Sequence, residues 1–211
     1  MLNYSGIVLA GGYSRRMGED KALLAVAGIP CYVRVVRTLA TVADDVWVVR
    51  RAEQPVLATK ALPVTGVVHD LRTGEGPLAG MEVGFSHMRH EWGFVVPADA
   101  PLIKRSLLMF MASLCEQARQ AHTEIRALIM QQRDQVYPLM GLYHHSVRQE
   151  VAELLDQGSR RVMDLLANLQ VRYITEGEWQ LADPEGVSFM MMNTQAQYEA
   201  VCTRLDGDGE Q

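Results

Sequence analysis

Short apolar runs rich in β-branched residues alternate along the chain with stretches in which apolar residues recur at helical spacing. The first pattern is typical of buried strands and the second of helices that pack by one face. Strands are therefore expected at residues 6–10, 46–49, 66–69, 92–96, 127–130, 136–143 and 171–174. Helices are expected at residues 30–40, 53–60, 77–88, 107–115, 147–155 (capped by Ser146) and 160–168. This alternation predicts an α/β fold, a mostly parallel, doubly wound, Rossmann-like sheet flanked by helices on both faces.

The length of the chain bears on its division into domains. Its 211 residues, 48% of them hydrophobic, can build one substantial core. We expect a single domain over residues 1–205, with no low-complexity linker inside it. Residues 206–211, Asp-Gly-Asp-Gly-Glu-Gln, are expected to form a flexible tail.

Charge and cysteine content narrow the possible partners and location. A formal net charge of -5 argues against electrostatic binding of nucleic acid over a broad surface, because such binding depends on clustered Lys and Arg. No apolar run approaches the roughly 20 residues that span a bilayer, so no membrane contact is expected. The 3 cysteines are far apart and odd in number, which favours reduced thiols. We expect a cytoplasmic protein.

The loop from Leu9 to Lys21 carries the clearest chemical signal. It follows the first expected strand, where an α/β fold places phosphate groups. Glycines let backbone N–H groups approach phosphate oxygens closely, and cationic side chains add positive charge to such a phosphate-binding loop. The loop holds three glycines and three cations: Gly11, Gly12, Gly18, Arg15, Arg16 and Lys21. A glycine pair alone could equally form an ordinary turn, and the spacing fits neither the GxGxxG nor the GxxxxGK[ST] motif.

Four segments together resemble one protein family. The loop resembles the LAGGxSxRMGxDK signature of the molybdenum cofactor guanylyltransferases and their nucleotidyltransferase relatives. Residues 76–81 resemble the GPLAG segment of that family, residues 97–101 its CDxP turn and residues 158–163 its GxRRVM segment. These segments occur in family order and at similar spacing over roughly residues 6–195.

The resemblance implies a reaction and its partners. Members of the family join GMP from GTP to the terminal phosphate of molybdopterin, which gives the guanine dinucleotide cofactor and pyrophosphate. GTP and molybdopterin are thus the implied substrates, with transient contacts to a GTP-binding adaptor and to molybdoenzyme maturation proteins. No nucleophile with an associated base stands out in the sequence, which is consistent with direct attack by the acceptor phosphate, aided by magnesium.

The resemblance also implies roles around the triphosphate. Leu9, Ala10, Gly11 and Gly12 are expected to contact the nucleotide through the backbone. Lys21 is expected to reach the phosphates, because phosphoryl transfer needs fixed positive charge around the reacting phosphorus. Arg16 is expected to share that catalytic work.

Two aspartates and two further glycines complete the implied nucleotide site. Asp99 follows an expected strand and is predicted to be the Mg²⁺ ligand, although on chemistry alone it could simply start the turn before Pro101. Asp70 is expected on the nucleoside side, with a turn or cap as the alternative. Gly76 and Gly80 are expected to let the backbone approach the base or the pterin.

On the molybdopterin side the resemblance indicates Arg161 and Asn193. Arg160 and Arg161 lie near an expected helix start, where guanidinium groups could bind a phosphate or could simply be exposed charges. Asn193 belongs to the segment Met191-Met192-Asn193-Thr194-Gln195, which stands where the family has NxNTP.

The chain departs from the family pattern at two positions, and each supports an alternative. Val49 stands where the family commonly has an asparagine near the guanosine, which leaves open a cytidylyltransferase or sugar-phosphate nucleotidyltransferase. Met191 replaces the earlier asparagine of NxNTP, which leaves open a catalytically weak carrier that binds nucleotide or cofactor.

Overall fold

A computed structural model describes residues 3–12, 20–70, 72 and 76–208, with the side chains of residues 206–208 left aside. The candidate residue Arg16 and the other residues of 13–19 lie outside this description.

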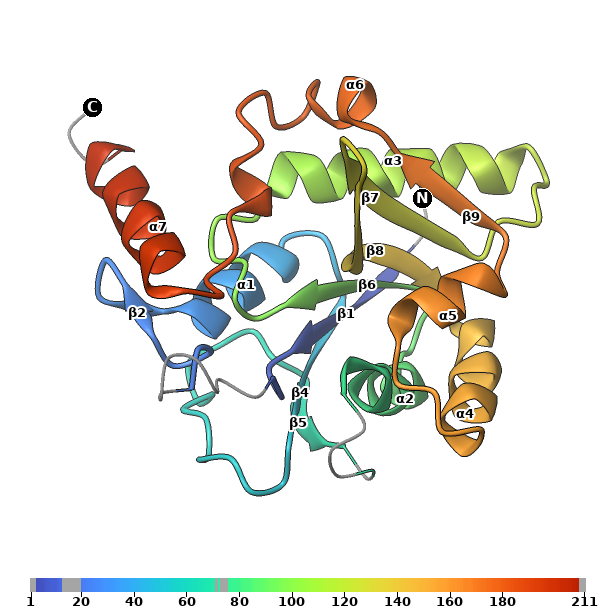
Figure 1. The fold of residues 1–211 in the computed structure, drawn as a ribbon, viewed down its shortest axis with the longest axis horizontal. Helices are drawn as coiled ribbons and strands as arrows, with labels where there is room; N and C mark the ends of the chain where they lie inside the picture. The colour runs from blue at the N-terminus through green and yellow to red at the C-terminus, as the bar shows by residue number, and fades with distance from the viewer. Residues whose placement is uncertain (1–2, 13–19, 71, 73–75, 209–211) are drawn as a thin grey trace.

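Seven strands form the central sheet, in the order β5-β4-β1-β6-β8-β7-β9 (Figure 1). Their bounds are β1 Tyr4–Leu9, β4 Asp45–Arg50, β5 Gly66–His69, β6 Trp92–Pro97, β7 Ala127–Gln132, β8 Gln135–His144 and β9 Val171–Ile174. β8 runs antiparallel to both of its neighbours, β6 and β7, and the other pairings are parallel. The expected mostly parallel sheet is confirmed.

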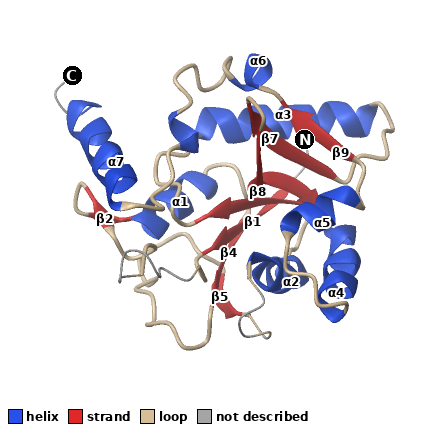
Figure 2. Cartoon of the chain, in the orientation of Figure 1, coloured by secondary structure: helices blue, strands red, loops and turns tan. Residues whose placement is uncertain are grey.

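Helices cover both faces of this sheet (Figure 2). The core on one face joins the sheet to α1 (Cys31–Leu39) and α3 (Arg105–Gln120). The core on the other face joins it to α2 (Pro77–His87), α4 (Arg148–Asp156) and α5 (Val162–Ala167). Neighbouring residues of a strand point to opposite faces, so Val8 packs in the first core and Ile7 in the second. Both faces being covered explains why the strands read as continuous apolar runs.

Smaller elements lie around the sheet. A two-stranded hairpin, β2 (Ala25–Val26) and β3 (Ile29–Pro30), leads into α1. Short 3-10 turns η1 (His145–Val147) and η2 (Val187–Phe189) and the helix α6 (Glu176–Trp179) connect the later elements. The chain ends in α7 (Gln195–Asp208), which packs against the hairpin and the start of α1. Residues 206–208 of the expected tail therefore continue a helix, and the domain boundary at residue 205 stays a prediction.

Three expectations about helices are corrected. Residues 53–60 form turns and irregular chain rather than a helix, because Pro55 cannot donate a helical hydrogen bond and restricts the residue before it. Ser146 does not cap α4: it lies inside η1, and its backbone N–H donates to Nδ1 of His144. The helix expected at 160–168 is shorter, since Arg161 is extended and α5 begins at Val162.

Candidate functional site

The candidate site lies where the parallel strands β1, β4, β5 and β6 end. Leu9 is in register with Val49 of β4 and with Pro97 of β6. Backbone hydrogen bonds continue just past the ends of the strands. The N–H of Ala10 donates to the carbonyl of Val49 at 2.8 Å, and the N–H of Ala98 donates to the carbonyl of Leu9 at 3.0 Å. The loops that leave these strands therefore surround one place, as expected at the carboxyl edge of a doubly wound sheet.

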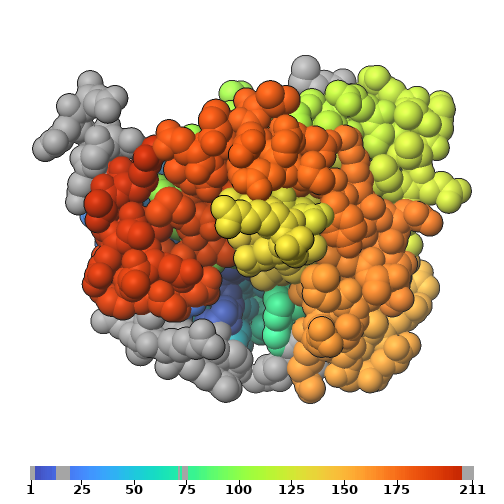
Figure 3. All heavy atoms as spheres, turned by 45° about the horizontal axis from the view of Figure 1, so that its top comes forward, coloured from blue at the N-terminus to red at the C-terminus, as the bar shows by residue number. Residues whose placement is uncertain are grey.

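These loops enclose a cleft of about 360 Å³. It is lined by Leu9, Ala10, Gly11, Gly12, Asp20, Lys21, Ala22, Val49, Arg51, Asp70, Gly76, Pro77, Gly80, Pro97, Ala98, Asp99, Leu139 and Asn193. In the space-filling view the molecule is hollowed between the red C-terminal part and the orange segment, with blue N-terminal residues at the floor (Figure 3). Ten of the twelve predicted site residues line this cleft; Arg161 is not among the lining residues, and Arg16 lies outside the described residues.

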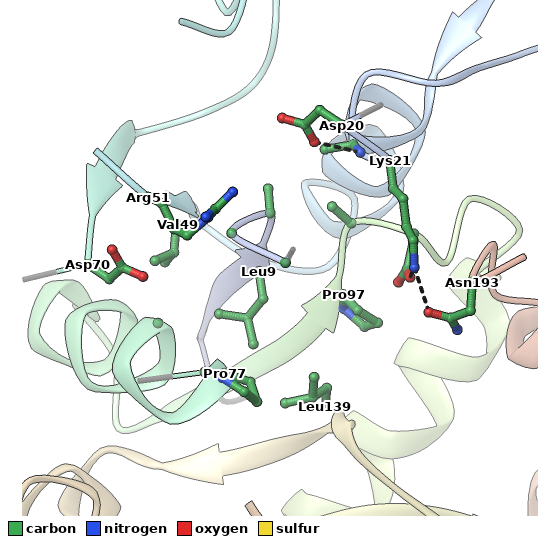
Figure 4. Close-up of a pocket in the computed structure, with 18 residues that line it drawn as sticks. Leu9, Asp20, Lys21, Val49, Arg51, Asp70, Pro77, Pro97, Leu139 and Asn193 are labelled. Carbon is green, nitrogen blue, oxygen red and sulfur yellow. Dashed lines mark hydrogen bonds and ion pairs between the residues drawn. The ribbon is translucent and has the colours of Figure 1, made fainter. Parts of the chain in front are cut away.

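Charged side chains lie at two ends of the cleft (Figure 4). Lys21 and Asn193 mark one end, together with Asp99. Arg51 and Asp70 mark the other, on either side of Val49. Between them lie residues 10–12, which start the glycine-rich loop, and an apolar floor that includes Leu9 and Pro77. This arrangement suits an elongated ligand with a strongly charged part and a flat, polar-edged part.

At the first end, three predicted residues from distant parts of the sequence meet. The Nζ atom of Lys21 donates to Oδ1 of Asn193 at 2.8 Å and lies 3.8 Å from Oδ2 of Asp99. The N–H of Met192 donates to the carbonyl of Asp99 at 3.0 Å, which ties the C-terminal segment to the loop after β6. Burial raises the pKa of Asp99, and the positive charge of Lys21 opposes that rise.

The donor set at Asp99 decides what kind of cation could bind there. In the part of the chain that the structure describes, no three His, Cys, Asp or Glu side chains gather as a metal site. A complete protein cage such as zinc requires is therefore not formed by these residues. Mg²⁺, by contrast, is usually held by one or two carboxylates together with substrate phosphates and water. The single carboxylate of Asp99, about one fifth exposed beside the glycine loop, fits that mode.

At the second end, Arg51 places a cation near Asp70. The Nη1 atom of Arg51 pairs with Oε1 of Glu53 at 3.1 Å, and a Cβ on Gly11 would lie 3.4 Å from Cγ of Arg51. Burial raises the pKa of Asp70, Glu53 raises it further, and Arg51 and His69 oppose the rise. A guanidinium and a carboxylate thus border the same part of the cleft.

The two later glycines serve different geometric needs. Gly76 has φ +71°, a conformation that glycine accepts readily, and it is the N-cap residue directly before α2. A Cβ on Gly80 would come within 3.1 Å of Cδ2 of Leu9 and 3.6 Å of Cγ1 of Val49. Gly80 therefore lets α2 pack closely on β1 and β4 beneath the cleft.

Arg161 remains outside the cleft. It is exposed just before α5 and is not among the described lining residues. Its neighbour Arg160 reaches the cleft region through the backbone, since a Cβ on Gly76 would lie 3.6 Å from the Arg160 carbonyl oxygen. The predicted role of Arg161 stays a prediction.

Two charged lining residues, Asp20 and Arg51, were missed in the sequence. Asp20 stands directly before Lys21 within the recognised signature, so its position was a signal, but no role was assigned to it. Arg51 has no comparable signal, because a second arginine after a strand is ordinarily a solvent-exposed charge. In a separate observation on the described residues, none of the helices is both long and apolar enough to cross a bilayer.

Comparison with known proteins confirms the resemblance. Residues 6–172 match the family model described as the MobA-like NTP transferase domain. The chain is 33% identical over 205 residues to a Bacillus cytotoxicus protein named "Probable molybdenum cofactor guanylyltransferase", covering 96% of this chain and 98% of that protein. A Geobacillus protein of the same name is 28% identical over 205 residues, covering 96% and 100%.

Solved structures share the fold. Molybdopterin-guanine dinucleotide biosynthesis protein A from Archaeoglobus fulgidus matches with a TM-score of 0.79 at 23% identity, covering 96% of this chain and 99% of that one. A 4-diphosphocytidyl-2C-methyl-D-erythritol synthase from Anaerococcus prevotii matches with a TM-score of 0.70 at 12% identity, covering 97% and 99%. At these identities the likeness concerns the fold alone.

Proposed function

The chain belongs to the family of MobA-like NTP transferase domains, and with this as premise we propose that it transfers GMP from GTP to the terminal phosphate of molybdopterin. The products are molybdopterin guanine dinucleotide and pyrophosphate. The observation that carries the proposal is the two-ended cleft, with Lys21, Asp99 and Asn193 at one end and Asp70 and Arg51 at the other.

The ends of the cleft match the two parts of GTP. The triphosphate belongs beside Lys21, where the glycine loop offers backbone N–H groups and fixed positive charge. The base then extends toward Asp70 and Arg51. Guanine carries two neighbouring donors, N1–H and the 2-amino group, that a carboxylate can accept, and two neighbouring acceptors, O6 and N7, that a guanidinium can bind. Neither adenine nor cytosine offers that pair of donors.

The reaction needs no covalent enzyme intermediate. An oxygen of the molybdopterin phosphate attacks the α-phosphorus of GTP, a new P–O bond forms, and the bond to the β-phosphate oxygen breaks as pyrophosphate leaves. Lys21 stabilises the charge on the phosphates, and Arg16 is proposed to share this role. Asp99 would hold a divalent cation, which we propose is Mg²⁺, together with the phosphates. When bound, that cation supplies neutralisation of phosphate charge.

The acceptor is proposed to enter beside the C-terminal segment. Asn193 already lies against Lys21, so it borders both the triphosphate and the space where an acceptor must approach. Arg161, which is exposed just before α5, is proposed to bind a phosphate of molybdopterin. Contacts with a GTP-binding adaptor and with maturation proteins belong to the same proposal. A cytoplasmic setting fits the cysteines, which form no disulfide in the structure.

The position of Met191 bears on the alternative of an inactive carrier. Met191 packs against the hydrophobic core and is not among the described residues that line the cleft. Its substitution for asparagine therefore leaves the Lys21–Asn193 contact in place. This argues for a working transferase rather than a carrier.

Two measurements test the proposal. Calorimetric titration with GTP, CTP and ATP in Mg²⁺ should give clear preference for GTP, and preference for another nucleotide would contradict the guanylyl assignment. Incubation with GTP, Mg²⁺ and molybdopterin should release pyrophosphate in step with formation of the dinucleotide. Tight GTP binding with no release would favour the carrier instead.

A further inference from the structure

Arg50, the last residue of β4, is almost completely buried. Its side chain is only 1% exposed. Residues of a strand alternate between faces, so Arg50 enters the same side of the sheet as Val46 and Val48. An arginine is rarely buried, and a buried charge is strongly unfavourable unless it is paired. Arg50 is therefore expected to be paired with an acidic side chain, and the pair holds that side chain in place.

That partner is Asp20, on the loop that carries Lys21. Nη2 of Arg50 lies 2.6 Å from Oδ2 of Asp20, and Nε2 of Gln54 donates to the same oxygen at 3.1 Å. The backbone N–H of Ala22 donates to Oδ1 of Asp20 at 3.1 Å. Gln54 is itself tied to the end of β4, because its Oε1 accepts from the N–H of Arg51 at 2.9 Å. The Asp20 carboxylate is thus held from three directions.

Fixing Asp20 also fixes the backbone of Lys21. The N–H of Leu23 donates to the carbonyl of Asp20 at 2.9 Å, and that of Leu24 to the carbonyl of Lys21 at 3.3 Å, so the chain forms a tight turn here. From this turn the two side chains leave in different directions, and that of Lys21 extends toward Asn193 (Figure 4). The bonds to Asp20 thus hold the turn from which the side chain of Lys21 extends.

Arg50 also contacts the other end of the cleft. Its carbonyl accepts from the N–H of Asp70 at 2.9 Å. One residue therefore joins the segment that carries Asp70 to the segment that carries Lys21.

We propose that Arg50 is a positioning residue for nucleotidyl transfer, which acts through Asp20 to hold Lys21 against the triphosphate. The inference rests on the phosphate-binding role proposed for Lys21. The positioning matters because a displacement of about 1 Å in a reacting group can lower a rate by about 100-fold.

Three variants test this role. Arg50→Met removes the charge at similar length, Arg50→Lys keeps a cation, and Asp20→Asn keeps the shape of the carboxylate while removing its charge. Arg126→Met is the matched control, because it removes an arginine ion pair, with Glu150, at the start of β7 and away from the cleft. Circular dichroism and thermal melting report folding of each variant. If Arg50→Met does not fold, Asp20→Asn decides the outcome.

The first readout is the environment of Lys21 itself. The chain has lysine at positions 21, 60 and 104 only, so lysine labelled with ¹³C at Cε gives few signals, and Lys21→Arg assigns one of them. Arg50→Met and Asp20→Asn should shift the Lys21 signal and leave those of Lys60 and Lys104 in place. Arg50→Lys should shift it less, and Arg126→Met should leave it unchanged.

The second readout is turnover. Pyrophosphate release from GTP should fall by about 10- to 100-fold in Arg50→Met and Asp20→Asn, recover partly in Arg50→Lys and stay near wild type in Arg126→Met. The KM for molybdopterin should change little. An unmoved Lys21 signal, or turnover within about twofold of wild type in a folded Asp20→Asn or Arg50→Met variant, would overturn the proposal. If the wild type releases no pyrophosphate, the proposed function fails, while the lysine signals still test the positioning by Arg50.

Discussion

The side-chain oxygen of Asn193 lies 2.8 Å from the ammonium nitrogen of Lys21, although 172 positions separate the two residues. The C-terminal segment reaches this place because Met192 is hydrogen-bonded to the carbonyl of Asp99. The segment just before α7 and a turn near the start of the chain thus complete one end of the cleft (Figure 4).

We expect Asn193→Leu to lower the rate of pyrophosphate release by about 10-fold or more, because Lys21 loses a hydrogen bond that orients it. Steady-state release from GTP in the presence of molybdopterin is the measurement. Asn168→Leu, at the exposed C-terminus of α5, is the matched control and should be near wild type. A fully active Asn193→Leu variant would separate the observed contact from catalysis.

Asp99→Asn should lower turnover by about 100-fold or more, because a neutral amide binds a hard cation poorly and the phosphates then lose the charge neutralisation that the cation supplies. Turnover of the wild type and the variant is compared over a range of Mg²⁺ concentrations. The variant should need more Mg²⁺, and chelation should stop the wild-type reaction. Asp134→Asn, in the exposed turn between β7 and β8, is the control. Unchanged Mg²⁺ dependence would show that Asp99 is not the metal ligand.

The affinity for GTP should depend on the ionisation of Asp70. Burial raises the pKa of this carboxyl, so it becomes protonated at a higher pH than an exposed aspartate, whose pKa is about 3.9. Only the ionised form accepts both guanine donors, so GTP affinity should fall as the pH is lowered toward that raised pKa. Calorimetry with GTP and with ITP, which lacks the 2-amino group, measures the effect.

Asp70→Asn supplies the comparison for this pH effect. It should abolish the pH dependence and reduce the preference for GTP over ITP by about 10-fold, since a hydrogen bond to a charged group is lost. If the variant keeps the wild-type preference, another residue must recognise the 2-amino group.

The strands of the sheet followed from short runs of apolar and β-branched residues in the sequence. The strands at 66–69 and 171–174 were predicted with their observed bounds, although they are partly buried edge strands, because each is a short run that contains β-branched residues. The helix α7 was missed although its signal was present. Tyr198, Val201, Cys202 and Leu205 recur at helical spacing and pack with the hairpin and the start of α1.

The sequence predicted the loop residues that line the candidate site. It did not predict the tertiary contacts that hold them in place. Glycines and an aspartate after buried strands identify the carboxyl edge of a parallel sheet, so Gly11 and Asp99 could be assigned. The burial of Arg50 could not be predicted, because an arginine at a strand end is ordinarily exposed and only the tertiary pairing with Asp20 buries it. The proximity of Asn193 to Lys21 likewise depends on packing between distant segments.

The last prediction concerns how the C-terminal segment is attached. Asp183 is completely buried, its Oδ1 lies 3.0 Å from Nζ of Lys104, and its Oδ2 accepts from the N–H of Ser188 at 2.8 Å. The N–H of Lys104 in turn donates to the hydroxyl of Ser188 at 3.0 Å. These bonds hold the segment before Met192 to the start of α3, close to the loop that carries Asp99.

Asp183→Asn should lower the free energy of unfolding by about 1–3 kcal/mol at neutral pH, because buried charge-assisted hydrogen bonds are lost while the partly exposed Lys104 can still be hydrated. Burial alone would raise the pKa of Asp183, but hydrogen bonds from Ser188 and Lys104 lower it overall. A carboxyl with a lowered folded-state pKa stabilises the protein above its unfolded pKa of about 3.9 and loses that effect as the pH falls through the folded value. The difference between wild type and variant in urea unfolding should therefore be large at pH 7 and shrink below about pH 4. A difference that stays constant with pH would show that the ionised form of Asp183 contributes nothing, and the exposed-turn variant Asp134→Asn should show no difference at either pH.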